Sequence, residues 1–319
     1  MKEAPLSSSL IKAEAARLGF AACGLARVTP VDESTALAFN RWIADGNHAD
    51  MDYMNRYGDA RFHPESVLPG CRTLVSLALD YTPTEPISAD RPQFAFYAYG
   101  PDYHETMKAK IRELAEAIRT KSEYSEHSEY SEKEFRIAVD TAPLLERYWA
   151  EQAGIGWIGR HHNLIIPGCG SFVNLGELLL TAKVDHYDQP IPNRCGTCHR
   201  CIDACPTGAL SEGSIDARRC LSYLTIEHRG SFSPEQASLV RNQPNPKYIY
   251  GCDRCQLACP WNKANKVNGA NKPNEVPLSA TSEEWLSLTR EQYQTLFRGS
   301  AVKRAKYEGL MRNIKTVLE

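Results

Sequence analysis

The pattern of apolar and polar positions predicts short helices alternating with strands over the first 185 residues. A helix is predicted over 6–18, where Ser7 to Ser9 offer an N-cap and Gly19 follows as a stop. A second helix is predicted over 104–120. A third is predicted to open at Pro143 and to run to about Ala153, because proline suits the first turn of a helix.

Apolar segments between these helices predict strands, at 20–28, 73–81, 135–140, 163–166 and 172–184. Helices and strands that alternate in this way are typical of an α/β or α+β domain. Residues 185–193 contain two prolines and are interpreted as a linker.

Two later changes in composition interrupt this pattern. Residues 122–132 repeat Ser-Glu-Tyr or Ser-Glu-His, an acidic and low-complexity segment that predicts an exposed loop insertion. After Trp261 the chain becomes rich in Asn, Lys and Pro, and a helical tail rich in Lys and Arg is predicted from Arg298 to Lys315. The tail could bind tRNA phosphates or could be a solvated helix face, and both interpretations stay open.

Composition places the chain among ordinary globular proteins, with 319 residues, 42% hydrophobic residues and a net charge of -2. The N-terminus has no apolar run behind a basic start, and no segment approaches the roughly 18 apolar residues of a membrane span. We therefore expect a cytoplasmic protein. Because disulfides are rare in the cytosol, the eleven cysteines favour metal binding.

Eight of the cysteines fall between Cys195 and Cys259, and seven of these form two related runs. The first is Cys195-Gly-Thr-Cys198-His-Arg-Cys201-Ile-Asp-Ala-Cys205-Pro206, a C-x2-C-x2-C-x3-C-P motif in which the fourth cysteine binds the other of two [4Fe–4S] clusters. The second, Cys252-Asp-Arg-Cys255-Gln-Leu-Ala-Cys259-Pro260, lacks one cysteine, which Cys220 can supply. One predicted cluster is held by Cys195, Cys198, Cys201 and Cys259, and the other by Cys205, Cys220, Cys252 and Cys255.

Structural zinc is the alternative, because C-x2-C pairs also bind zinc, but the C-x3-C-P endings favour iron–sulfur clusters. Clusters carry electrons and bind no organic substrate, so residues 1–185 must explain what the electrons are for. Cys23, Cys71 and Cys169 are predicted to be buried thiols and not ligands.

Six further motifs together resemble those of epoxyqueuosine reductases, over roughly residues 5–315. They are Arg61-Phe62-His63-Pro64, Tyr99-Gly100-Pro101-Asp102-Tyr103-His104, Val139-Asp140-Thr141-Ala142-Pro143, Gly156-Trp157-Ile158-Gly159, Cys220-Leu221-Ser222-Tyr223-Leu224-Thr225-Ile226-Glu227 and Gly251-Cys252-Asp253. The resemblance implies a cobalamin-dependent oxidoreductase with two [4Fe–4S] clusters. It would reduce the epoxide of epoxyqueuosine to queuosine at the wobble position of tRNA, the last step of queuosine biosynthesis.

The resemblance also implies an architecture. An α/β (α+β) cobalamin-binding domain similar to that of reductive dehalogenases would be followed by a ferredoxin-like domain with two [4Fe–4S] clusters. We accordingly expect a catalytic domain at 1–185, the ferredoxin-like domain at 186–265 and the basic helical tail at 266–319. Longer family members continue into helical repeats where this sequence ends, so tRNA contacts made by the repeats would be absent or replaced here.

Roles for individual residues follow from the same resemblance. It implies that Asp140 is the proton donor and that Arg229 contacts tRNA. It also implies a set of cobalamin contacts, at Arg61, Tyr103, Asp140, Ser222 and Asp253. The residues alone favour Asp140 as an N-cap of the helix at Pro143, whose N-terminus would lower the pKa of its carboxyl, and the resemblance reverses this preference.

Other assignments stay open or negative. Asp102-Tyr103-His104 begins a D-x-H-x-x-G cobalt-binding pattern, but Met107 replaces the glycine, so His104 is predicted to be structural. Two alternative functions are a cobalamin-dependent enzyme of the reductive dehalogenase type and a ferredoxin-type electron carrier without a corrinoid. The partners expected are tRNA carrying epoxyqueuosine and an external electron donor, with no membrane, and the protein is expected to be a monomer.

Overall fold

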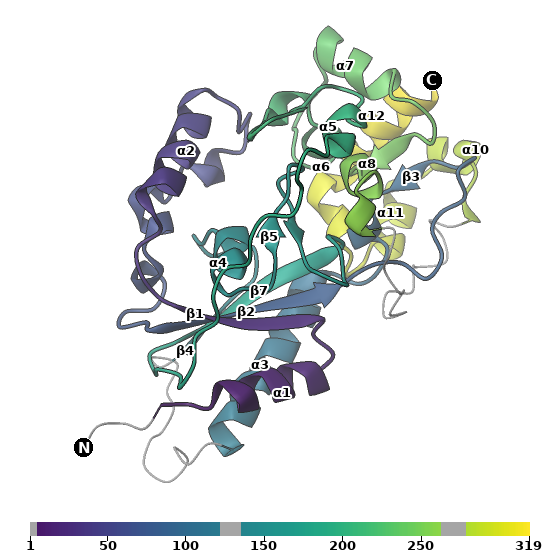
Figure 1. Ribbon diagram of the computed structural model, residues 1–319. Helices are drawn as coiled ribbons and strands as arrows, with labels where there is room; N and C mark the ends of the chain where they lie inside the picture. Colours follow the sequence, from purple (N-terminus) through teal and green to yellow (C-terminus); the bar gives the residue numbers. More distant parts are fainter. Residues whose placement is uncertain (1–4, 122–134, 263–278) are drawn as a thin grey trace.

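The computed structural model describes residues 5–121, 135–262 and 279–319 (Figure 1). The predicted loop insertion at 122–132 and the polar segment after Trp261, at 263–278, lie outside the described residues. Within the described ranges, no helix has the length and apolar character needed to cross a membrane.

A four-stranded sheet organises the N-terminal part, in the order β1 (Ala22–Arg27), β2 (Thr73–Asp80), β7 (Val173–Leu180) and β4 (Phe135–Ala138). Its three pairings are all antiparallel, so of the two predicted fold classes the structure selects α+β. The predicted strands are confirmed, although β7 ends at Leu180, four residues before the predicted end.

Helices α1 (Ser8–Arg17) and α3 (Tyr103–Lys121) cover one face of this sheet (Figure 1). Both were predicted, and the side chain of Ser7 caps α1 as expected. Helix α3 buries one stripe of apolar side chains that includes Met107 and Ile111. A Cβ on Gly176 of β7 would lie 2.8 Å from the end of the Met107 side chain, so glycine permits this close packing.

Helix α4 (Glu146–Gln152) packs on the opposite face. The approach is close, because a Cβ on Gly24 would lie 2.0 Å from the carbonyl oxygen of Ala153. This face also carries two buried polar side chains, Ser76 and Glu177, which are directly opposite each other in β2 and β7. Helix α4 therefore packs on a sheet face that contains two buried polar side chains, Ser76 and Glu177, among apolar ones.

The predicted start of this helix is wrong. Leu145 is the N-cap residue, and Pro143 lies in a preceding turn that follows β4. Two backbone hydrogen bonds across two residues, from Thr141 to Val139 and from Leu144 to Ala142, tighten that turn. Helix α2 (Glu33–Ala44), which was not predicted, has no fully buried side chain and is capped by Asp32.

The second half of the described chain is built from short elements. Helices α5 (Arg200–Asp203) and α8 (Arg254–Leu257) contact each other, and strands β3 (Gln93–Phe94) and β10 (Tyr248–Tyr250) are parallel. The other helices here are α6 (Leu221–Ile226), α7 (Pro234–Arg241), α10 (Ser282–Leu286), α11 (Arg290–Leu296) and α12 (Lys306–Leu318).

Shorter elements connect these helices and strands. The two-residue strands are β5 (Trp157–Ile158), β6 (Leu164–Ile165), β8 (Leu210–Ser211) and β9 (Ser214–Ile215). The 3-10 helices are η1 (Asp52–Met54), η2 (Gly58–Phe62), η3 (Pro64–Ser66), η4 (Phe96–Ala98), η6 (Ala217–Arg219), η7 (Pro260–Asn262) and η8 (Ala301–Ala305).

One hydrophobic core joins three parts of the sequence that the domain prediction separates. It contains Phe94 from β3, Leu224 from α6, and Trp285 and Leu310 from the C-terminal helices. Figure 1 shows α10, α11 and α12 gathered beside β3 and α8 at one end of the molecule. The boundaries at 185 and 265 stay predictions.

Candidate functional site

Cys220 and the cysteines of the two runs come together in space as two groups of four. Burial raises the pKa of the Cys255 thiol, and the negative charges of Cys252, Cys220, Asp253 and Cys205 raise it further. Burial also raises the pKa of Cys259, which has Cys195 and Cys198 as charged neighbours. Cys201 has Cys259 and Cys195 as its charged neighbours. Cys205 is thus near Cys220, Cys252 and Cys255, while Cys259 is near Cys195, Cys198 and Cys201; the division of these cysteines between two clusters stays a prediction.

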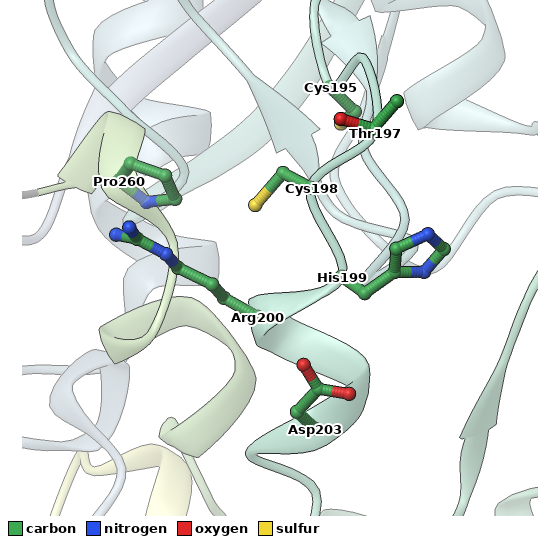
Figure 2. A pocket seen from close by; sticks show the side chains of 7 residues that line it. All are labelled: Cys195, Thr197, Cys198, His199, Arg200, Asp203 and Pro260. Atoms are coloured by element: carbon green, nitrogen blue, oxygen red, sulfur yellow. The ribbon is translucent and has the colours of Figure 1, made fainter.

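The first group borders an open hollow of about 470 Å³ (Figure 2). Figure 2 shows Cys198 and Arg200 beside Pro260, at the start of α5. The hollow is lined by Cys195, Thr197, Cys198, His199, Arg200, Asp203 and Pro260. The second group is more strongly desolvated, because burial raises the pKa of Cys252 to about 12.

The thiol groups have the donor chemistry of cubane clusters. Each iron of such a cluster takes one cysteine thiolate, so four thiols surround a body of several atoms. In the described part of the chain, no three His, Cys, Asp or Glu side chains are placed to hold a single metal ion. Cys23, Cys71 and Cys169 lie away from both groups in the apolar clusters of the N-terminal part.

Asp140 lies in the turn after β4 with a left-handed backbone, at φ +56°. The Tyr103 hydroxyl donates to its Oδ2 at 2.9 Å, and Nε2 of His104 lies 3.4 Å from the same oxygen. The hydrogen bond from His104 is the largest cause that lowers the pKa of Asp140, and burial opposes it. The side chain is 60% exposed, so it is open to a substrate.

The N-cap interpretation of Asp140 is therefore wrong, since Leu145 occupies that position. The lowered pKa has a different cause from the expected helix N-terminus, namely His104 and Tyr103. His104 has a partner on each ring nitrogen, because its Nδ1 lies 2.7 Å from Asp102 Oδ1. It is satisfied, as predicted, but its place beside Asp140 was not anticipated.

Glu146 is a second residue that the sequence analysis missed. Its Oε1 accepts a hydrogen bond from the backbone N–H of Asp140, at 2.5 Å, and so holds the turn to the first residue of α4. Burial raises the pKa of Glu146 to about 7, and the charge of Asp140 adds to the effect. The spacing of six residues between the two acids gave no sign of this contact.

The other predicted cobalamin contacts, Arg61, Asp253 and Ser222, lie in two regions: Arg61 near Tyr53, and Asp253 and Ser222 next to cysteines of the second group. Arg61 is buried and donates to the Tyr53 carbonyl at 3.2 Å, while its Nε has no partner among the described residues. Asp253 is buried, accepts from the Phe96 N–H at 2.7 Å, and has a pKa raised by burial to about 7. Ser222 is half-buried in α6, and its backbone, with that of Tyr223, opposes the rise that burial causes in the pKa of Cys220.

Arg229 and the tail lie on the same side as Arg61 and Asp140. Arg229 donates to the Arg304 carbonyl at 2.8 Å, and Arg304 forms an ion pair with Glu227 at 2.6 Å. The Arg304 guanidinium lies over the ring of Tyr53, and Arg304 is also a charged neighbour of Asp140. Arg61 contacts the carbonyl of the same Tyr53. Arg61, Asp140 and Arg229 are therefore linked through Tyr53 and Arg304.

The loop between β5 and β6 carries polar atoms without partners. Arg160 Nε and Nη1, His161 Nε2 and His162 Nε2 are buried and make no hydrogen bond within the described ranges. Buried donors of this kind normally have a partner, so they fit a large polar ligand. A corrinoid, whose rim carries amide groups, has the matching chemistry.

These features are those of an iron–sulfur oxidoreductase. The two groups of four cysteines can hold clusters, the unpartnered polar groups fit a large ligand, and Asp140 is an acid at a strand end. Comparison with known proteins agrees: the model of a 4Fe-4S double cluster binding domain matches residues 194–262. The epoxyqueuosine reductase QueG model matches residues 61–141. Epoxyqueuosine reductases of Leadbetterella byssophila and Escherichia coli are 40% and 36% identical, over 98% and 97% of this chain and 98% and 79% of theirs. The chain belongs to the epoxyqueuosine reductase family.

Solved structures share the fold. One is an epoxyqueuosine reductase with a tRNA-Tyr epoxyqueuosine-modified stem loop, with a TM-score of 0.82 and 26% identity over 97% of this chain and 80% of the other. The Streptococcus thermophilus epoxyqueuosine reductase has a TM-score of 0.80 and 27% identity over the same shares.

Proposed function

We propose that this protein reduces the epoxide of epoxyqueuosine to the alkene of queuosine at the wobble position of tRNA. The observation that carries the proposal is Asp140, an acid held by two donors at a strand end and open to a substrate. Membership of the family supports the reaction, and the relative bound to an epoxyqueuosine-modified stem loop supports tRNA as the substrate.

Two [4Fe–4S] clusters supply the electrons in this proposal. The first is held by Cys195, Cys198, Cys201 and Cys259, and the second by Cys205, Cys220, Cys252 and Cys255. The mutual charge neighbours within each group support this division. The hollow at Cys195 and Cys198 makes the first group the accessible one, where an external electron donor would deliver electrons.

Cobalamin, when bound, supplies reduced cobalt that meets the substrate. The proposed contacts are Arg61, Tyr103, Asp140, Ser222 and Asp253. The unpartnered Nε of Arg61 and the unpartnered donors at 160–162 support a polar ligand in this neighbourhood. Asp253, with its pKa near 7, can donate as an acid or accept as a carboxylate.

Asp140 gives protons to the departing oxygen. Reduction of the epoxide to the alkene consumes two electrons and two protons, and the oxygen leaves as water. A solved relative from Bacillus subtilis has an aspartate catalytic loop swung out of its active site, which supports placing the acid of this chain on a turn. Tyr103 and His104 orient the Asp140 carboxyl and stabilise its charged form between donations.

Arg229 is the proposed tRNA contact at the edge of this site, and exposed lysines of the tail extend it. Lys303 and Lys306 are exposed, whereas Arg304 is paired with Glu227 and Arg312 donates to the carbonyls of 224, 228 and 230. Fewer basic side chains of the tail are therefore free to contact phosphates than its sequence suggests. We further propose that the protein acts as a monomer in the cytoplasm.

A direct assay tests the function. The protein, loaded with iron–sulfur clusters and cobalamin under anaerobic conditions, is given a low-potential reductant and tRNA that contains epoxyqueuosine. Mass spectrometry of the digested nucleosides should show epoxyqueuosine converted to queuosine. Unchanged epoxyqueuosine with protein that contains both clusters and the corrinoid would contradict the proposal.

A further inference from the structure

The second proton of the reaction needs a source besides Asp140 itself. Both protons end on the same oxygen, so an acid that contacts this oxygen must donate twice in one turnover. Asp140 carries one proton at most, and its surroundings favour the carboxylate. This question rests on the proposed function, because it arises from the stoichiometry of epoxide reduction.

Two further carboxyls lie directly behind Asp140. Glu146 accepts the Asp140 backbone N–H, and Glu177 comes from the middle of β7. Glu177 is opposite Ala138 in β4, two residues before Asp140, and opposite Ser76 in β2. The three acids therefore run from the open turn at the end of β4 to the interior of the sheet.

Glu177 has no visible structural reason to be an acid. It is 0% exposed, and in the described part of the chain its carboxyl has no hydrogen-bonding neighbour besides the carboxyl of Glu146. The opposing Ser76 hydroxyl is also buried and unpartnered. A buried carboxyl without a cation or donor stays protonated, because ionisation in an apolar core is strongly unfavourable. Such a group is a candidate for a role in proton chemistry.

The charged groups around this pair agree with one shared proton. Burial raises the pKa of Glu177, and the charges of Glu146 and Asp140 raise it further. Glu146 faces Asp140, Glu177 and the neighbouring cation Arg147, whose guanidinium donates to the His162 carbonyl. Tyr103 is a further neighbour of Glu146. Arg147 is the cation beside Glu146, whereas His104 and Arg304 are the cations beside Asp140, so Glu146 and Glu177 cannot both be ionised without repulsion.

We propose that Glu146 and Glu177 form a proton relay that recharges Asp140 within each turnover. After Asp140 gives its first proton to the epoxide oxygen, its carboxylate takes the proton held by the pair, directly or through one water. Asp140 then gives this second proton to the same oxygen, which leaves as water. The pair is reprotonated from solvent after the product leaves. Glu146 and Glu177 touch no substrate and act through Asp140.

The relay is needed because the bound substrate blocks direct protonation of Asp140 by solvent water. The Asp140 side chain is 60% exposed, so water can protonate it between turnovers. A nucleoside over the turn excludes that water during the reaction. The acids behind the turn are then a proton source that the substrate does not cover.

Difference infrared spectroscopy as a function of pH tests directly whether Glu146 and Glu177 hold a proton. The sample is the purified holoenzyme without tRNA. The wild type should show the carbonyl band of a protonated carboxylic acid that titrates near pH 7. Asp253 also has a pKa raised to about 7, so the band of Glu146 is the one near pH 7 that Glu146→Gln removes, while Glu177→Gln removes the carboxylic acid band of the more strongly raised Glu177. Glu151→Gln is the matched control, because Glu151 lies in α4 and accepts from the Ile158 N–H outside the relay.

Turnover supplies the second readout. An acid relay must be protonated, so wild-type turnover should fall as pH rises through about 7. Glu177→Gln should lower turnover roughly 10²-fold, at the low end of general acid catalysis, and remove that limb. Added small weak acids should restore part of the rate. Glu146→Gln keeps an acceptor for the Asp140 backbone N–H and should show the same losses as Glu177→Gln. Glu151→Gln should keep the wild-type rate and pH dependence.

Two outcomes would overturn the relay: no carboxylic acid band removed by Glu177→Gln, or a Glu177→Gln enzyme with the wild-type rate and pH limb. If Glu177→Gln does not fold, Glu146→Gln decides by the same two measurements. A wild-type holoenzyme that leaves epoxyqueuosine unchanged would instead overturn the proposed function, and the infrared result would still establish whether the pair stores a proton.

Discussion

The Tyr103 hydroxyl donates a hydrogen bond of 2.9 Å to Oδ2 of Asp140, and so joins the start of α3 to the turn after β4. The two residues are 37 positions apart in the chain, and the sheet brings them together. His104 stacks on the Tyr103 ring with 4.1 Å between ring centres and reaches the same oxygen. The acid is therefore positioned by two neighbouring residues of one helix.

His104→Gln tests the electrostatics of this arrangement through the pH dependence of stability. The pKa of His104 is raised by Asp140, so its contribution is present below the ordinary value of 6.5 and is lost as pH rises through the raised pKa. The pKa of Asp140 is lowered, so its contribution is present above 3.8 and is lost as pH falls through the lowered pKa.

The wild type should therefore gain stability relative to His104→Gln mainly between these two ordinary pKa values. Thermal unfolding against pH measures the difference, and it should shrink at both ends of the range. His199→Gln, at the hollow away from Asp140, serves as the control and should not change the shape of the curve. An equal difference between the wild type and His104→Gln at every pH would contradict this prediction.

Cys205→Ser tests the division of the cysteines. Cys205 follows Cys201 closely in sequence, but its thiol is a charged neighbour of Cys220 and Cys255. The variant should therefore lose or alter the second cluster and keep the first, as measured by iron content and electron paramagnetic resonance of the reduced protein. Loss of the first cluster with the second intact would show that the grouping is wrong.

Lys303→Gln combined with Lys306→Gln tests the tail as a tRNA surface. Removing one lysine–phosphate interaction should reduce the slope of log affinity against log salt by roughly one unit. The double variant should therefore bind tRNA more weakly and with a flatter salt dependence than the wild type. Arg304 is left unchanged because it is paired with Glu227.

Lys108→Gln on α3, whose lysine pairs with Glu105, is the matched control for this loss of charge. Cluster content should be the same in all variants. An unchanged salt slope in a folded double variant would remove the tail from the tRNA surface and leave Arg229 as its proposed contact.

The sequence predicted what depends on local spacing. The Ser7 cap and the apolar strands needed only neighbouring positions, and the structure agrees with them. The cysteine runs also needed only local spacing, and the model of a 4Fe-4S double cluster binding domain matches the residues that contain them. Glu177 was missed because a lone acid in a strand is ordinarily on its solvent face, and only the pairing with Ser76 and Ala138 shows that this face is covered.

Long-range pairing explains the other differences. Arg304 and Glu227 are 77 residues apart, so the count of basic tail residues could not show that one of them is already neutralised. Pro143 fits the first turn of a helix, but the tight turn at 140–145 delays the helix until Glu146. The resemblance placed the acid, while its donors His104 and Tyr103 and its neighbour Glu146 required the fold.

Asp140→Asn in the cell tests the central claim most directly. A strain that lacks the gene is complemented with the wild type or with Asp140→Asn, and nucleosides from its tRNA are measured by mass spectrometry. The purified variant should keep both clusters and the corrinoid yet lose about 10²–10⁴-fold in turnover. We predict that the wild type restores queuosine and that Asp140→Asn leaves epoxyqueuosine. Full queuosine with Asp140→Asn, at equal protein levels, would contradict the assignment of Asp140 as the acid.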